Sequence, residues 1–119
     1  MNNSLPNNIP EYTKNAINDF VSEVNKKFGT RIKMIYLYGS YARGDFNDGS
    51  DIDIMILTDF SDEEIIDNRD IIYELSYDIE EKYDFSIYLS PLVKNIDKFE
   101  EKLDYSFFYT NVKKDGVII

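Results

Sequence analysis

Residues 37–54 read Leu37-Tyr38-Gly39-Ser40-Tyr41-Ala42-Arg43-Gly44-Asp45-Phe46-Asn47-Asp48-Gly49-Ser50-Asp51-Ile52-Asp53-Ile54. In this stretch a small Gly-Ser turn precedes two aspartates that alternate with isoleucines. A turn of small residues lets backbone N–H groups approach a phosphate closely. Carboxylates two residues apart on a strand point to the same face, where they can share a divalent cation. Together the two features predict a site for a nucleoside triphosphate and Mg²⁺.

The sequence predicts a strand on each side of the turn. Residues 33–38 are apolar and rich in β-formers, and residues 51–57 alternate polar and apolar before becoming fully apolar. The second pattern is typical of a strand with one end open to a cleft and the other end buried. Asp51 and Asp53 should therefore face away from the core that Ile52 and Ile54 enter. An edge strand with solvated acids is the alternative to a metal site.

The segments Gly39-Ser40, Ala42-Arg43-Gly44 and Ser50-Asp51-x-Asp53 resemble the signature of the DNA polymerase β-type nucleotidyltransferase superfamily. The short chain and its intact Tyr-Ala-Arg-Gly segment resemble the minimal nucleotidyltransferase (MNT) branch. Members of that branch are commonly the antitoxins of HEPN/MNT toxin–antitoxin pairs. The signature covers residues 34–57, and a weaker likeness extends over residues 108–119. It is specific for the superfamily and much less specific for the substrate.

The resemblance implies roles for the signature residues. Gly39 and Ser40, with nearby backbone N–H groups, would hold the β- and γ-phosphates of ATP. Asp51 and Asp53 would be catalytic ligands of Mg²⁺. Arg43 would contact a phosphate, or would instead pair with a neighbouring aspartate and brace the loop.

The family also uses a third carboxylate on a later strand. Asp84 is the candidate for this catalytic and metal-binding role, because residues 84–89 are the later strand-like run that opens with an acid. There it would act as a ligand or as the base that activates the acceptor hydroxyl. The alternative is a structural aspartate in a turn between a helix and a strand.

The amino-acid composition excludes several kinds of catalytic and metal site. The 119 residues contain no cysteine and no histidine, so thiol catalysis, zinc–thiolate sites and histidine bases are excluded, and carboxylates with a metal remain. The net charge is −10, which disfavours long nucleic acid as a partner. We find no segment long and apolar enough to cross a membrane and no signal peptide, so a cytoplasmic protein is expected.

The remaining pattern predicts one α/β domain over residues 1–119, with a small mixed sheet flanked by helices, as in the polymerase β-like fold. Residues 1–9 are expected to be flexible. We predict one helix from Pro10 to Gly29, a second that begins at a capping box formed by Ser61 and Glu64, and a third over residues 95–103. A short helix or bent extension should follow at 104–111, and a terminal strand at 117–119. An aromatic cluster at residues 105–109 belongs either to the core or to an interface.

Three functions remain open at this stage. The first, implied by the resemblance, is Mg²⁺-dependent transfer of AMP from ATP to a hydroxyl of a partner HEPN toxin, which is thereby neutralised. The second is an antitoxin that acts by binding alone. The third is a nucleotidyltransferase for a small hydroxyl compound such as an aminoglycoside. Base preference, the modified residue, the number of nucleotides transferred and the oligomeric state are not readable from the sequence.

Overall fold

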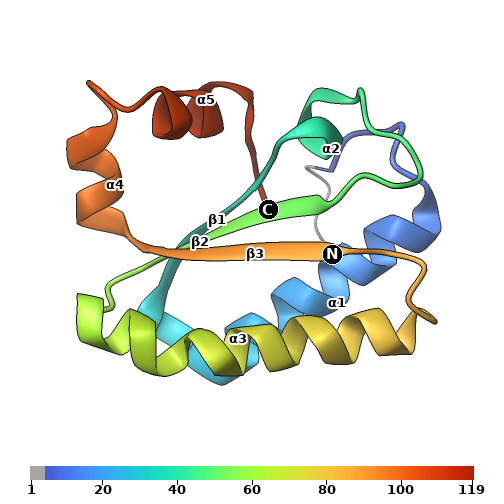
Figure 1. The fold of residues 1–119 in the computed structure, drawn as a ribbon, viewed down its shortest axis with the longest axis horizontal. Helices are drawn as coiled ribbons and strands as arrows, with labels where there is room; N and C mark the ends of the chain where they lie inside the picture. Colours follow the sequence, from blue (N-terminus) through green and yellow to red (C-terminus); the bar gives the residue numbers. More distant parts are fainter. Residues whose placement is uncertain (1–4) are drawn as a thin grey trace.

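A computed structural model describes residues 5–119, and in it helices lie on both faces of one sheet (Figure 1). The elements in chain order are α1 (Glu11–Phe28), η1 (Gly29–Arg31), β1 (Ile32–Tyr38), α2 (Ser40–Arg43), β2 (Ile52–Thr58), α3 (Asp62–Lys82), β3 (Leu89–Asn95), α4 (Ile96–Lys102), α5 (Phe107–Asp115) and β4 (Val117–Ile118).

The sheet is mixed, with the strand order β3-β2-β1-β4. Strand β1 pairs antiparallel with β2 and with β4, whereas β2 and β3 are parallel. This arrangement confirms the predicted α/β fold with a small mixed sheet. It also brings the end of β1 beside the start of β2, since Tyr38 pairs with Asp53.

The alternation of side chains along β2 produces two cores. Ile52, Ile54 and Ile56 are buried with α1 and α3 on one face of the sheet. Met55 and Leu57 are buried on the other face, against α4 and α5. Asp53 shares the α4/α5 face with Met55 and Leu57, so its carboxylate points away from the α1/α3 core, as predicted.

Local sequence signals explain most helix boundaries. The capping box is confirmed, because the Ser61 hydroxyl accepts a hydrogen bond from the Glu64 amide and the Glu64 carboxylate accepts one from the Ser61 amide. The predicted first helix and the helix after residue 95 are confirmed as α1 and α4. The short terminal strand is confirmed as β4.

The strand predicted at residues 84–89 is wrong, because α3 continues to Lys82 and a turn follows it. Asp84 and Phe85 both have a φ of 56°, the left-handed conformation that ends helices and is incompatible with a strand. The Phe85 amide donates to the Glu80 carbonyl across this turn. Asp84 therefore has the turn position that was the alternative to a strand position.

The third strand instead spans Leu89–Asn95 and includes Pro91, beyond the predicted run at residues 84–89. The Ile52 amide donates to the Tyr88 carbonyl, so in a parallel ladder the alternate residues Leu89, Pro91 and Val93 turn their backbone groups to the free edge. A proline is tolerated there because no ladder hydrogen bond is lost. Only the edge position of β3 makes this assignment possible.

Burial bears on two further expectations, which concern the N-terminal segment and the aromatic cluster at residues 105–109. Leu5 and Ile9, in the segment expected to be flexible, are buried in the α1/α3 core, while residues 1–4 lie outside the described part. In the aromatic cluster Tyr109 is buried, but Tyr105 is 73% exposed and Phe107 is 89% exposed. Within residues 5–119, no helix is both long enough and apolar enough to span a bilayer.

Candidate active site

The Gly-Ser turn and the Asp-x-Asp strand meet at the junction of β1 and β2. Gly39 has a φ of 72°, and a Cβ atom built on it would lie 2.2 Å from Oδ2 of Asp53. A side chain at position 39 is therefore disfavoured both by the backbone conformation and by the position of the Asp53 carboxylate. The glycine lets the backbone of the turn approach a carboxylate directly, so the residues predicted to bind phosphate and those predicted to bind metal are brought together.

The turn leads into the four-residue helix α2. The first amides of a helix have no intrahelical partner, so the N–H groups of Ser40 and Tyr41 are available to an anion. Behind the turn, Tyr41 and Phe46 stack with ring centroids 4.3 Å apart. The side-chain amide of Asn8 also donates to the Gly44 carbonyl at 3.1 Å. The stacked rings and this hydrogen bond hold α2 and the residues that follow it in place.

The loop between α2 and β2 is closed by its own polar side chains. The Asn47 carbonyl oxygen of the side chain accepts a hydrogen bond from the Gly49 amide, and the Ser50 hydroxyl accepts one from the Asn47 amide. These bonds are typical of the turns that an Asn-Asp-Gly segment forms. The loop delivers Asp51 directly before β2.

Asp51 and Asp53 differ in environment. Asp51 is exposed, whereas Asp53 is half-buried at the start of β2. Burial, followed by the negative charge of Asp51, raises the pKa of Asp53, and Arg43 partly offsets this effect. Two carboxylates whose charges repel each other are a suitable donor set for a hard cation.

The donor set fits Mg²⁺, which commonly takes one or two protein carboxylates and completes its shell with water and substrate phosphates. Asp51 and Asp53 supply such a pair. Within residues 5–119, no group of three acidic side chains gathers to form a metal cage. The structure thus does not bring Asp84 together with the Asp51/Asp53 pair.

The position of Asp84 has a structural explanation. The turn around it is attached to α1: the Tyr83 hydroxyl donates to Oδ2 of Asp19 at 2.6 Å, and the Tyr12 hydroxyl donates to the Tyr83 carbonyl at 2.9 Å. Asp84 itself is exposed and donates its amide to the Glu81 carbonyl. Its predicted place as third ligand, which needed a strand position beside β2, is therefore not supported.

Arg43 takes the bracing arrangement that was its alternative. Its Nε lies 3.3 Å from Oδ2 of Asp45, and the side chain is 47% exposed. A surface pair of this kind contributes little to stability and separates easily. Because Arg43 also influences the pKa of Asp53, it remains within electrostatic reach of the carboxylate pair.

Two residues near the site were missed by the sequence interpretation. Ser90 is the residue of β3 that pairs with Asp53, so a hydroxyl occupies the neighbouring position on that face. Tyr38 pairs with Asp53 from β1, and burial followed by the Asp53 charge raises the pKa of Tyr38 to about 12. The ring of Phe108 packs edge-on against Tyr38 at 5.7 Å. Only the strand register reveals these neighbours.

Comparison with known proteins supports this description. A Methanocaldococcus jannaschii protein named "Putative protein adenylyltransferase" is 36% identical over 87% of this chain and 94% of its own length. A "putative nucleotidyltransferase" from Sulfolobus solfataricus superimposes with a TM-score of 0.54 and 21% identity, over 94% of this chain and 88% of that chain.

A mutant of "the toxin-antitoxin MntA-HpeT" superimposes with a TM-score of 0.50 and 17% identity, over 92% of this chain and 72% of that one. These two structures share the fold. The family model described as "Nucleotidyltransferase domain" matches residues 17–119, which include the turn, the carboxylate pair and all four strands. The chain belongs to the nucleotidyltransferase domain family.

Proposed function

We propose that this protein transfers AMP from ATP to a hydroxyl of a partner protein, with Mg²⁺ bound by Asp51 and Asp53. The observation that carries the proposal is the contact of Gly39 with Asp53, because it joins an anion-binding turn to a metal-binding carboxylate. The name of the M. jannaschii relative supports adenylyl transfer to protein. The partner we propose is a HEPN toxin that is neutralised in the cytoplasm, and the toxin–antitoxin structure with the same fold supports this choice.

The residues of the turn would bind and orient the nucleotide. Amides at the start of α2, with the Ser40 hydroxyl, would hold the β- and γ-phosphates, and Arg43 could leave Asp45 to contact a phosphate oxygen. Mg²⁺ held by Asp51 and Asp53 would supply electrostatic stabilisation of the charge that develops on the phosphate oxygens.

The transfer itself is a displacement at the α-phosphorus. The acceptor oxygen forms a bond to that phosphorus, the bond to the bridging oxygen of pyrophosphate breaks, and the hydroxyl proton passes to water. The chain contributes position and electrostatics to this step. We propose no role as a base for Asp84, because it is held in the turn after α3.

The surroundings of the site favour a protein acceptor over a small one. Phe108 borders Tyr38 at the site, and the adjacent Phe107 is 89% exposed. Exposed aromatic side chains of this kind are enriched at protein interfaces. An aminoglycoside would need acidic groups in a closed pocket and would make little use of this aromatic surface.

The test is intact-mass measurement of a purified HEPN-type toxin after incubation with this protein, ATP and Mg²⁺. We expect the toxin to gain the mass of one or more AMP units. In the double variant Asp51→Asn with Asp53→Asn, the rate of this transfer should fall at least about a hundredfold. Transfer retained in the double variant would contradict the mechanism. Neutralisation without a mass gain, retained in the double variant, would instead show an antitoxin that acts by binding alone.

A further inference from the structure

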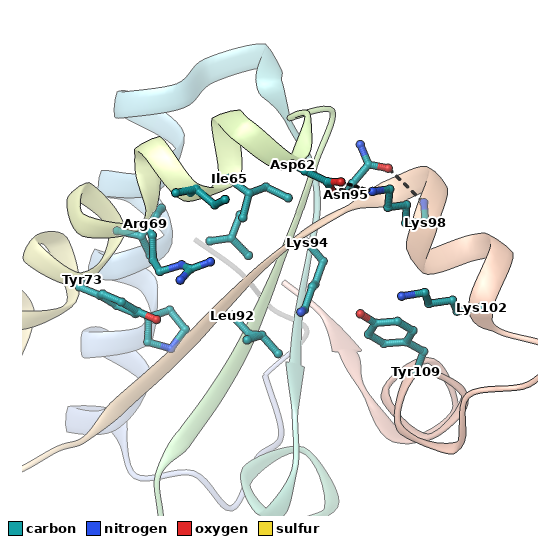
Figure 2. A pocket seen from close by; sticks show the side chains of 14 residues that line it. Asp62, Ile65, Arg69, Tyr73, Leu92, Lys94, Asn95, Lys98, Lys102 and Tyr109 are labelled. Atoms are coloured by element: carbon teal, nitrogen blue, oxygen red, sulfur yellow. Dashed lines mark hydrogen bonds and ion pairs between the residues drawn. The ribbon is translucent and has the colours of Figure 1, made fainter.

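A cavity of about 520 Å³ opens along the free edge of β3, away from the Gly-Ser turn (Figure 2). Its volume is in the range of ordinary ligand sites. Residues 91–95 of β3 form its floor. Arg69 and Tyr73 of α3 line one side, and Lys102 of α4 with Tyr109 of α5 lines the other.

The cavity collects positive charge in an acidic protein. Four of the 13 basic residues line it: Arg69, Lys94, Lys98 and Lys102. Asp62 is the acid in its lining, and this carboxylate pairs with Lys98 at 2.6 Å. In the described part of the chain, no ion pair involves the other three cations. A concave surface lined by four cations and one carboxylate attracts an anion even when the whole chain carries a charge of −10.

The three cations without an ion pair are spread across the cavity, on both sides of β3. Figure 2 shows Arg69 on the α3 side, Lys94 rising from the floor and Lys102 on the α4 side. A single phosphate is held by donors that converge on one point, whereas this distribution suits an extended anion with several carboxylates. A second copy of the chain in the same place would set cations against cations. An acidic peptide segment is the complementary occupant.

The cavity also lies in register with the catalytic carboxylate. Asp53 pairs with Ser90, and Leu57 pairs with Lys94. Alternate residues of a strand face the same side, so Lys94 shares a face with Ser90 and Asp53 and lies roughly 13 Å along the strand. An extended peptide covers that distance in about four residues.

We propose that this cavity binds an acidic, extended segment of the protein acceptor, with carboxylates about four residues from the hydroxyl that is modified. The inference rests on the proposed adenylyl transfer, because that function requires an acceptor chain to reach Asp53. Pro91 offers no N–H at the strand edge, so side-chain charge rather than strand addition provides most of the recognition.

The test measures binding without catalysis. The probe is a fluorescein-labelled peptide with one tyrosine followed by glutamates from the third to the sixth position, and the matched probe has glutamines there. Arg69→Glu with Lys94→Glu is compared with Lys26→Glu and Lys27→Glu, which change the net charge equally at exposed positions of α1. Thermal unfolding verifies that each variant is folded.

We expect the acidic peptide to bind more tightly than the glutamine peptide. The cavity variant should bind the acidic peptide about tenfold more weakly than the wild-type protein does, whereas the α1 control should stay within about twofold of wild type. Equal binding by the cavity variant and the control, equal binding of both peptides, or no binding of the acidic peptide would overturn the proposal.

The toxin-modification assay separates this proposal from the proposed function. Peptide binding that depends on the cavity, without AMP transfer to any protein, would contradict adenylyl transfer but leave the cavity assignment in place. Normal AMP transfer with an unchanged acceptor KM in Arg69→Glu with Lys94→Glu would remove the cavity assignment and leave the enzyme.

Discussion

Replacing Gly39 by alanine is the most direct perturbation of the site. The new Cβ would lie 2.2 Å from Oδ2 of Asp53, while ordinary contact begins at 3.4 Å, so the carboxylate would have to retreat by about 1.2 Å. The backbone φ of 72° adds about 1–2 kcal/mol of strain for a residue with a side chain. We therefore expect a loss of stability of about 1–3 kcal/mol.

The displacement should affect activity far more than folding. A misplacement of about 1 Å at a catalytic group costs roughly a hundredfold in rate. Urea unfolding measures the stability change, and transfer of labelled AMP to the protein acceptor measures the rate at a temperature where the variant remains folded.

Gly29→Ala is the matched control. Gly29 has a φ of 54°, so alanine is strained there too, but nothing lies within 4 Å of its Cβ position. The control should lose about the same 1–2 kcal/mol and keep its activity. If Gly39→Ala and Gly29→Ala transfer AMP at the same rate per folded molecule, the contact between the turn and Asp53 is not part of the site.

Three further outcomes follow from other contacts. Asp84→Asn should keep the rate of AMP transfer within about twofold of wild type and the free energy of unfolding within about 0.5 kcal/mol, measured by the same assays, because asparagine also tolerates the left-handed turn. Ser61→Ala should lower the free energy of unfolding in urea by about 1 kcal/mol, since the Ser61 hydroxyl accepts a hydrogen bond from the Glu64 amide. Burial and the bond to Asp19 raise the pKa of Tyr83 from 10.0 to about 12, so this stabilisation is complete below pH 10 and is lost as the pH rises through about 12. Wild-type protein should thus lose more unfolding free energy than Tyr83→Phe between about pH 9 and about pH 11.5.

The sequence was sufficient where short-range chemistry determines the structure. The capping box at Ser61 and the turn at Asn47 are each made by side chains within a few residues of the groups that they satisfy. The β1–turn–β2 unit was also predictable, because Gly39 and the alternating aspartates specify its geometry.

Prediction failed where distant contacts decide between two local possibilities. Residues 84–89 alternate like a strand, but Asp84 and Phe85 end α3 in the left-handed conformation, and the bond from Tyr83 to Asp19 ties the turn to α1. The strand that follows contains Pro91, which a sheet tolerates only at an edge, and the edge position of β3 is set by the order of the whole sheet. Leu5 became a core residue through packing with residues far along the chain.

The surroundings of Asp53 connect the two proposals through one face of the sheet. On the β1 side, Tyr38 beside Asp53 leads to Phe108 and to the exposed aromatic end of α5. On the β3 side, Ser90 beside Asp53 leads along the strand to Lys94 and the cationic cavity. A small acceptor bound at the carboxylates would not use the far end of either extension, because Lys94 lies roughly 13 Å along the strand from Asp53. A protein acceptor that presents a hydroxyl to Asp53 would contact both, so variants in the cavity and in α5 should raise the KM for the acceptor without changing that for ATP.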